Sequence, residues 1–189
     1  APGGHCLRDP TLCVRGNSNG DQRNTRLPDL TRNTELVRQL DKLTPGHLPQ
    51  TVFEAVARLV ITPTFVVVPL FRRGNSTRVV LTRRDKGDTQ YAGMLHPPGK
   101  ILLASDEDLE AVFARLAATE LHDLDIRSGP VFVKHFFDQI TRGHEISMVH
   151  YLEISDPAND VPSYDPSALP VDVIQTDVPR IVAAVEAFK

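Results

Sequence analysis

The pattern of apolar residues along the chain predicts where its strands lie and where its helices lie. Residues 64–71 (TFVVVPLF) form a continuous apolar run rich in β-branched side chains, which predicts a buried strand. A second strand is predicted over 77–83, after a polar turn at 72–76. Two more are predicted over 131–140 and 146–154, joined around the turn at 141–144. We expect these four strands to form one sheet.

Helical spacing predicts four further segments. The first begins at Asn33 or Thr34 and ends at Pro45–Gly46, and the second covers 50–59. The third begins after Ser105, a predicted N-cap, and its buried face is formed by Leu109, Val112, Phe113, Leu116 and Ala117. The last follows Thr176 or Asp177 as cap. Strands and helices in this order predict an α/β/α sandwich with helices on both faces of a mixed sheet.

Residues 1–33 lack apolar periodicity and predict an extended polar leader. We expect 34–189 to form a single domain, with 34–60 as a helical lead-in, because 189 residues at 41% hydrophobic composition support one core. The leader holds both cysteines, Cys6 and Cys13, which could form a small disulfide loop or stay free. A metal site there would need more ligands than the adjacent His5 supplies.

The charge balance narrows the class of partner. A formal net charge of -3 argues against a generic nucleic-acid binder, which would be basic. No apolar stretch approaches the ~20 residues that span a bilayer, and the first residues contain no apolar signal core. We expect a soluble, cytoplasmic protein without a membrane partner. A homodimer stays open.

Glu120 stands out because it falls in the middle of the apolar face of the third helix. A carboxylate there, in the last turn of a helix, is unfavourable both for burial and for the helix dipole. It therefore needs a cationic partner. The partner is either a metal ion or an arginine of the neighbouring segment, such as Arg83 or Arg84.

The stretch around this glutamate resembles the signature of the Nudix hydrolase superfamily. A Pro-Pro-Gly-Lys turn ending at Lys100 precedes Glu107, and seven residues separate Glu107 from Arg115, as in that signature. Glu120 falls on the second glutamate of its Glu-Glu pair. The match is degenerate: Leu116 and Thr119 replace acids, His122 replaces a glycine, and Gly99 lies two residues too far from Glu107. A rival register, in which Thr119–Leu121 is the Arg-Glu-aliphatic triplet and Asp123 a later acid, leaves the helix start unmatched.

The resemblance implies a Nudix-like sandwich over roughly 64–188 and hydrolysis of a nucleoside-diphosphate-linked substrate with Mg²⁺ or Mn²⁺. A hard cation with oxygen ligands neutralises the charges of such a diphosphate during attack by water. The metal ligands are then Glu120 and Asp123, and the catalytic set is Glu120, Glu145 and Arg115. Arg115 orients the acids, while Glu145 is an acid from outside the motif whose alternative is a solvated turn residue. Substrate phosphates are assigned to Gly99, Lys100, Arg83 and Arg84.

A second hypothesis is a catalytically impaired module of the same fold, which binds a nucleotide-like ligand or a protein partner without turnover. It is motivated by Leu116 and Thr119, since only one of three expected carboxylates remains on the helix edge. A structural domain whose helix edge is sealed by packing is the third alternative. In the first two cases, the expected small-molecule partner contains phosphate.

Overall fold

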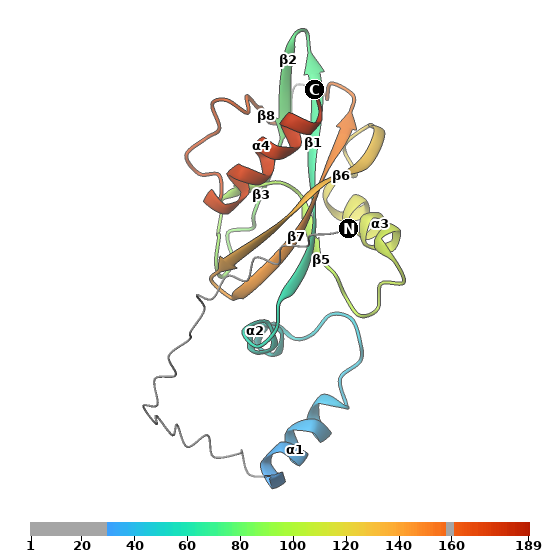
Figure 1. Ribbon diagram of the computed structural model, residues 1–189, viewed down its shortest axis with the longest axis vertical. Helices are drawn as coiled ribbons and strands as arrows, with labels where there is room; N and C mark the ends of the chain where they lie inside the picture. The colour runs from blue at the N-terminus through green and yellow to red at the C-terminus, as the bar shows by residue number, and fades with distance from the viewer. Residues whose placement is uncertain (1–29, 158–160) are drawn as a thin grey trace, which may run out of the picture. The chain divides into compact units, whose positions relative to one another are not determined.

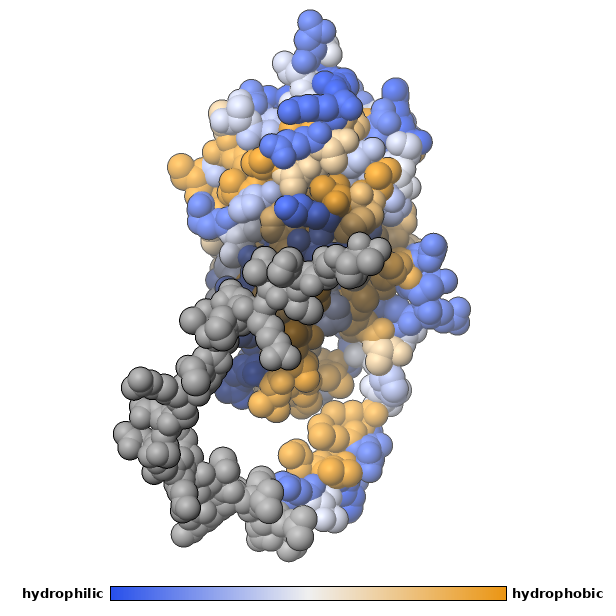
Figure 2. Space-filling view, in the orientation of Figure 1, coloured by the Kyte–Doolittle hydropathy of each residue, from blue (hydrophilic) through white to orange (hydrophobic). Residues whose placement is uncertain are grey.

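A computed structural model of the chain describes residues 30–157 and 161–189. The predicted polar leader, with Cys6 and Cys13, lies outside these ranges except for its last residues. The chain divides into two units, Ala1–Lys42 and Leu43–Lys189. In the first, helix α1 (Leu30–Leu40) begins before the predicted Asn33 or Thr34 and ends before Pro45. Its apolar residues Leu36, Val37 and Leu40 are exposed, and Figure 2 shows orange side chains on this helix.

The second unit contains the sheet and the remaining helices (Figure 1). In chain order its elements are α2 (Gln50–Ala57), β1 (Thr62–Arg73), β2 (Ser76–Val80), β3 (Thr82–Arg83), β4 (Leu95–His96), β5 (Gly99–Ile101), α3 (Leu109–Glu120), β6 (Ile126–Ile140), β7 (Gly143–Ile154), β8 (Ser163–Tyr164), the 3₁₀ helix η1 (Gln175–Asp177) and α4 (Val178–Ala187). The strands predicted over 64–71, 131–140 and 146–154 are confirmed. The strand predicted over 77–83 is divided between β2 and β3.

Strand β1 lies at the centre of a mixed sheet. The strand order is β6-β7-β1-β2-β8, and β5 pairs with β1 as well. β1 is parallel to β7, with Thr62 opposite Glu145, and antiparallel to β2 and β5. β6 and β7 form an antiparallel hairpin, while β3 and β4 form a separate two-stranded sheet.

The continuous apolar run of β1 follows from burial on both faces of the sheet. Val66, Val68 and Leu70 point into a core that includes Ile181 and Ala184 of α4. Phe65, Val67 and Phe71 point into a second core, which includes Val112 and Leu116 of α3. Figure 1 shows α3 and α4 on opposite sides of the sheet. The predicted α/β/α sandwich is therefore confirmed.

Helix α3 begins later than its sequence predicts. Asp108, and not Ser105, is the N-cap, and its carboxylate accepts a hydrogen bond of 2.8 Å from the Ala111 amide. Leu109 is exposed, so its assignment to the buried face is wrong. Because the helix begins at Leu109, the acidic residues before it form a loop, in which Asp106 accepts from the Leu103 amide.

Within the described ranges, no helix is both long and apolar enough to cross a membrane.

Candidate functional site

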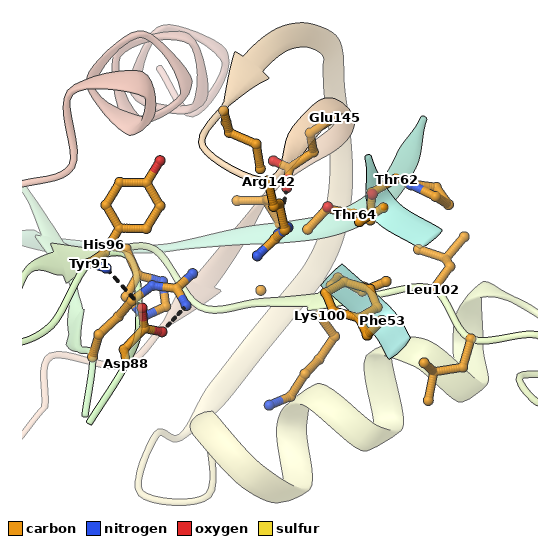
Figure 3. A pocket seen from close by; sticks show the side chains of 18 of the residues that line it. Phe53, Thr62, Thr64, Asp88, Tyr91, His96, Lys100, Leu102, Arg142 and Glu145 are labelled. Atoms are coloured by element: carbon orange, nitrogen blue, oxygen red, sulfur yellow. Dashed lines mark hydrogen bonds and ion pairs between the residues drawn. The ribbon is translucent and has the colours of Figure 1, made fainter. Parts of the chain in front are cut away.

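A cavity of about 760 Å³ opens at the end of the sheet where β1 begins, within the second unit. Its walls come from α2, the start of β1, β5, the segment 82–91, the β6–β7 turn and the first turn of α4. Figure 3 shows Arg142 and Glu145 on one side of it, Asp88, Tyr91 and His96 on another, and Leu102 on a third. Segments far apart in the sequence thus share one concave surface, as small-molecule sites usually do.

Most residues predicted for the site line this cavity. The lining includes Glu120, Glu145, Arg115, Gly99, Lys100, Arg83 and Arg84. Asp123 is not among the lining residues. Its side chain is 77% exposed and lies 3.1 Å from the His122 ring. The structure therefore separates Asp123 from Glu120, its predicted companion as a metal ligand.

Glu120 has a lysine as its cationic partner, and not Arg83 or Arg84. The Lys100 ammonium lies 2.5 Å from Glu120 Oε1, and the Gly99 amide donates to Oε2 at 3.3 Å. The backbone of Gly99 lies close to β1, since a Cβ there would lie 3.2 Å from the Phe65 carbonyl oxygen. The Pro-Pro-Gly turn thus brings the backbone and one cation to the end of α3.

Arg115 fastens the loop before α3 instead of contacting Glu120. Its guanidinium donates to Asp106 at 2.7 Å and to the Ile101 carbonyl oxygen at 2.9 Å. Glu107, which matches the Nudix signature by spacing, is exposed. The adjacent Asp106 takes the arginine, and this ion pair holds the pKa of Asp106 below its ordinary value.

Glu145 belongs to a buried network of ion pairs in the cavity wall, so its alternative as a solvated turn residue is wrong. Only 4% of Glu145 is exposed. It accepts from Arg142 at 3.0 Å, from Arg180 at 3.1 Å and from the Ser147 hydroxyl at 2.9 Å. Arg180 also donates to Asp177 and Asp138, each at 2.7 Å.

The sequence analysis did not identify Arg142, Arg180 or Asp177 as site residues. Arg142 lies in the β6–β7 turn, and Arg180 lies in the first turn of α4, three residues after Asp177. Of the two predicted caps of α4, Thr176 and Asp177, the second occupies the N-cap position, but its side chain makes no capping hydrogen bond and binds Arg180 instead. The sequence did contain one signal for this ion pair. Asp177 and Arg180 are three residues apart at the start of an otherwise apolar helix, a spacing at which side chains can pair.

The segment 82–91 adds the third polar wall. Arg84 donates to Asp88 at 2.9 Å, and its guanidinium lies 5.7 Å from the centre of the Tyr91 ring. Arg83 binds Asp172 at 2.7 Å and also donates to the Gly93 carbonyl oxygen. Both arginines therefore hold defined positions through ion pairs within the fold.

Several donors in the cavity lining have no hydrogen-bond partner in the part of the chain that the structure describes. They are the Nε atoms of Arg84, Arg142 and Arg180, together with the Thr64 hydroxyl. Thr64 is 8% exposed, and Figure 3 shows its side chain beside Arg142 and Glu145. These four atoms are themselves shielded from solvent, so they lie behind the cavity surface, and a ligand would meet the other nitrogen atoms of the guanidinium groups.

The carboxylates of the lining do not fit a divalent cation in their present arrangement. Of the five carboxylates in the lining, four contact a lysine or arginine: Asp88, Glu120, Glu145 and Asp177. The fifth, Asp85, accepts a hydrogen bond from the Gly87 amide. Among the described residues, no three histidine, cysteine, aspartate or glutamate side chains are grouped so that they could hold a metal ion. Mg²⁺ needs carboxylate oxygens that are free to coordinate it. The carboxylate of Glu120 is not free in this sense, because it already binds the Lys100 ammonium.

Asp177 and His96 make the stability of the folded protein depend on pH in opposite directions. Burial raises the pKa of Asp177 from 3.8 to about 6, so the folded state retains a proton that the unfolded chain loses, and stability falls as pH rises through this range. Burial, with Arg84 nearby, lowers the pKa of His96 from 6.5 to about 4. The unfolded chain is then protonated first, and stability falls as pH drops through that range.

We therefore expect single substitutions to separate these two dependences. Between pH 4 and 6, the stability of His96→Gln should decline more with rising pH than that of the wild type, and that of Asp177→Asn should decline less or rise. Urea unfolding at intervals across this range measures both. Stability curves parallel to the wild type in both variants would contradict these pKa shifts.

Comparison with known proteins gives similarity at the level of structure. No family model matches the chain, and no curated protein matches it. The NUDIX domain of Shewanella oneidensis NrtR, solved in complex with ADP ribose, has a TM-score of 0.54 at 16% identity, and the match covers 75% of this chain and 100% of that one. A mutT/nudix family protein from Listeria innocua has a TM-score of 0.50 at 16% identity, covering 67% and 93%. C. elegans Ap4A hydrolase has a TM-score of 0.50 at 9% identity, covering 68% and 98%.

The chain has the Nudix fold, as the degenerate signature implied. At these identities the similarity concerns the fold, so the function is argued from the cavity itself.

Proposed function

We propose that the protein is a Nudix-fold module that binds a phosphate-containing, nucleotide-like ligand in this cavity without metal-dependent turnover. The observation that carries the proposal is the cationic part of the cavity lining, which includes Arg84, Lys100 and Arg142. Guanidinium and ammonium groups suit phosphate oxygens, because the hydrogen bonds are charge-assisted. The pairing of four of the five lining carboxylates with cations supports binding over metal-assisted hydrolysis.

The other end of the cavity suits the organic part of such a ligand. Its apolar lining comes from α2, the start of β1 and the loop after β5, and includes Leu48, Phe53, Val56, Ile61 and Leu102. The guanidinium of Arg142 lies 5.7 Å from the centre of the Phe53 ring, between the apolar and polar parts. A ligand with a charged group at one end and a flat or apolar group at the other matches this division.

Calorimetric titration with ADP-ribose in EDTA tests the proposal, because ADP-ribose has both groups. We expect saturable binding by the wild type, and about tenfold weaker binding by Arg142→Met, since a charge-assisted hydrogen bond contributes roughly 1.5–3 kcal/mol. Arg127→Met, an exposed arginine outside the lining, is the matched control and should bind like the wild type. Absence of binding to ADP-ribose and to related nucleoside diphosphates would refute the proposal.

Metal-dependent hydrolysis is a second candidate, because Glu120 from the end of α3 does line the cavity beside Gly99. This candidate requires turnover of a nucleotide-sugar, dinucleoside or ADP-ribose-type substrate with Mg²⁺ or Mn²⁺, lost in Glu120→Gln. That result would replace the binding proposal with a divergent Nudix hydrolase.

A further inference from the structure

Lys100 and Glu120 form a pair that faces the cavity. Lys100 lies on β5 and its ammonium reaches the last residue of α3, where it lies 2.5 Å from the carboxylate. Figure 3 shows its side chain extending from β5 toward this helix. The two side chains are 25% and 20% exposed, so solvent and ions can approach them.

Three features favour a cation at this position. The carboxylate of Glu120 carries the charge, and the C-terminal end of α3 adds partial negative charge from its carbonyl groups. The Gly99 amide binds the second carboxylate oxygen and so orients the first toward Lys100. A divalent ion entering here would have to displace an ammonium that already satisfies the carboxylate, and it would meet the repulsion of that ammonium.

We propose that Lys100 is the built-in cation of this site: it occupies the place at Glu120 that a divalent metal ion would otherwise take, and it makes phosphate binding independent of metal. The metal-independence of ligand binding rests on the proposed function above. The exclusion of metal from Glu120 by Lys100 does not, and can be measured without a ligand.

Paramagnetic broadening by Mn²⁺ provides that measurement, because it detects weak and partial occupancy near a backbone amide. In ¹H–¹⁵N spectra recorded with increasing MnCl₂, we expect the Gly99 resonance of the wild type to broaden no earlier than those of exposed acidic residues. In Lys100→Met it should broaden at about tenfold lower Mn²⁺, since one repelling charge in contact is removed. Lys86→Met, which removes an exposed lysine outside the lining, is the matched control.

The double variant Lys100→Met/Glu120→Gln assigns the effect to the carboxylate. It should return the Gly99 resonance to wild-type behaviour, because the Mn²⁺ ligand is lost. Equal sensitivity of wild type and Lys100→Met to Mn²⁺ would overturn the proposal. The spectra also report whether each variant is folded, and Lys100→Gln repeats the test if methionine perturbs the fold.

Titration with ADP-ribose separates this proposal from the proposed function. The wild type should bind equally well in EDTA and in Mg²⁺, while Lys100→Met should bind about tenfold more weakly in EDTA and recover in Mg²⁺, held by Glu120 and the ligand phosphates. Failure of the wild type to bind ADP-ribose counts against the proposed function alone. Binding by the wild type that requires Mg²⁺ counts against the role of Lys100.

Discussion

Replacement of Arg180 by alanine is expected to destabilise the protein by about 3–5 kcal/mol, because it leaves buried carboxylates without their cation. Arg180 is 5% exposed and donates to Asp138, Glu145 and Asp177. It joins the first turn of α4 to the β6–β7 hairpin across the cavity wall. Urea unfolding at pH 7 measures the change in the free energy of unfolding.

Arg73→Ala is the control for this experiment. Arg73 also forms an ion pair, with Asp156, but both side chains are exposed. Solvent screens exposed ion pairs, so this variant should remain close to the wild type in stability. A loss at Arg180 no larger than that at Arg73 would contradict the role assigned to the buried network.

Replacement of Gly143 by alanine is expected to cost about 2–4 kcal/mol, from backbone strain together with overpacking. Gly143 has φ +140°, and a Cβ there would lie 2.5 Å from the Ala57 carbonyl oxygen. Neither atom can move easily, because Gly143 begins β7 and Ala57 is the last residue of α2. Denaturant unfolding measures the loss, and we expect ligand affinity to fall as well, since α2 forms the apolar wall of the cavity.

Gly74→Ala separates strain from overpacking. Gly74 has φ +60°, and a Cβ there would meet nothing within 4 Å. This variant should lose only the backbone contribution, roughly 1–2 kcal/mol. An equal loss of unfolding free energy in the two variants would show that the contact between the β6–β7 hairpin and α2 does not contribute to stability.

The apolar pattern predicted most of the sheet and its two covering helices, because burial on both faces of β1 leaves a signal that is local in the sequence. The start of α3 was misjudged since Ser105 and Asp108 are both good N-caps, and the choice depends on Arg115 holding Asp106 in the preceding loop. That contact is tertiary, so a reading of helix signals alone does not include it.

The candidate site was predicted most directly where its residues lie in one segment. The Pro-Pro-Gly-Lys turn and Glu120 lie close in the sequence, and the structure brings them together, although their roles stay predictions. The network around Arg180 joins the β6–β7 hairpin to residues 177–180, which lie about thirty residues further along the chain. Helix α2 lies outside the stretch that resembles the family. No sequence spacing relates residues so far apart, so their proximity can be seen only in the folded structure.

The parallel pairing of β1 with β7 also has a consequence for how the chain folds. Thr62 lies opposite Glu145, and the whole of α3 and β6 lies between them in the sequence. The entropy of closing so long a loop is paid before the pairing is gained, so the centre of the sheet forms late. During synthesis on the ribosome, the apolar strand β1 stays unpaired with β7 until β7 has emerged. In that interval the nascent chain most needs protection from aggregation.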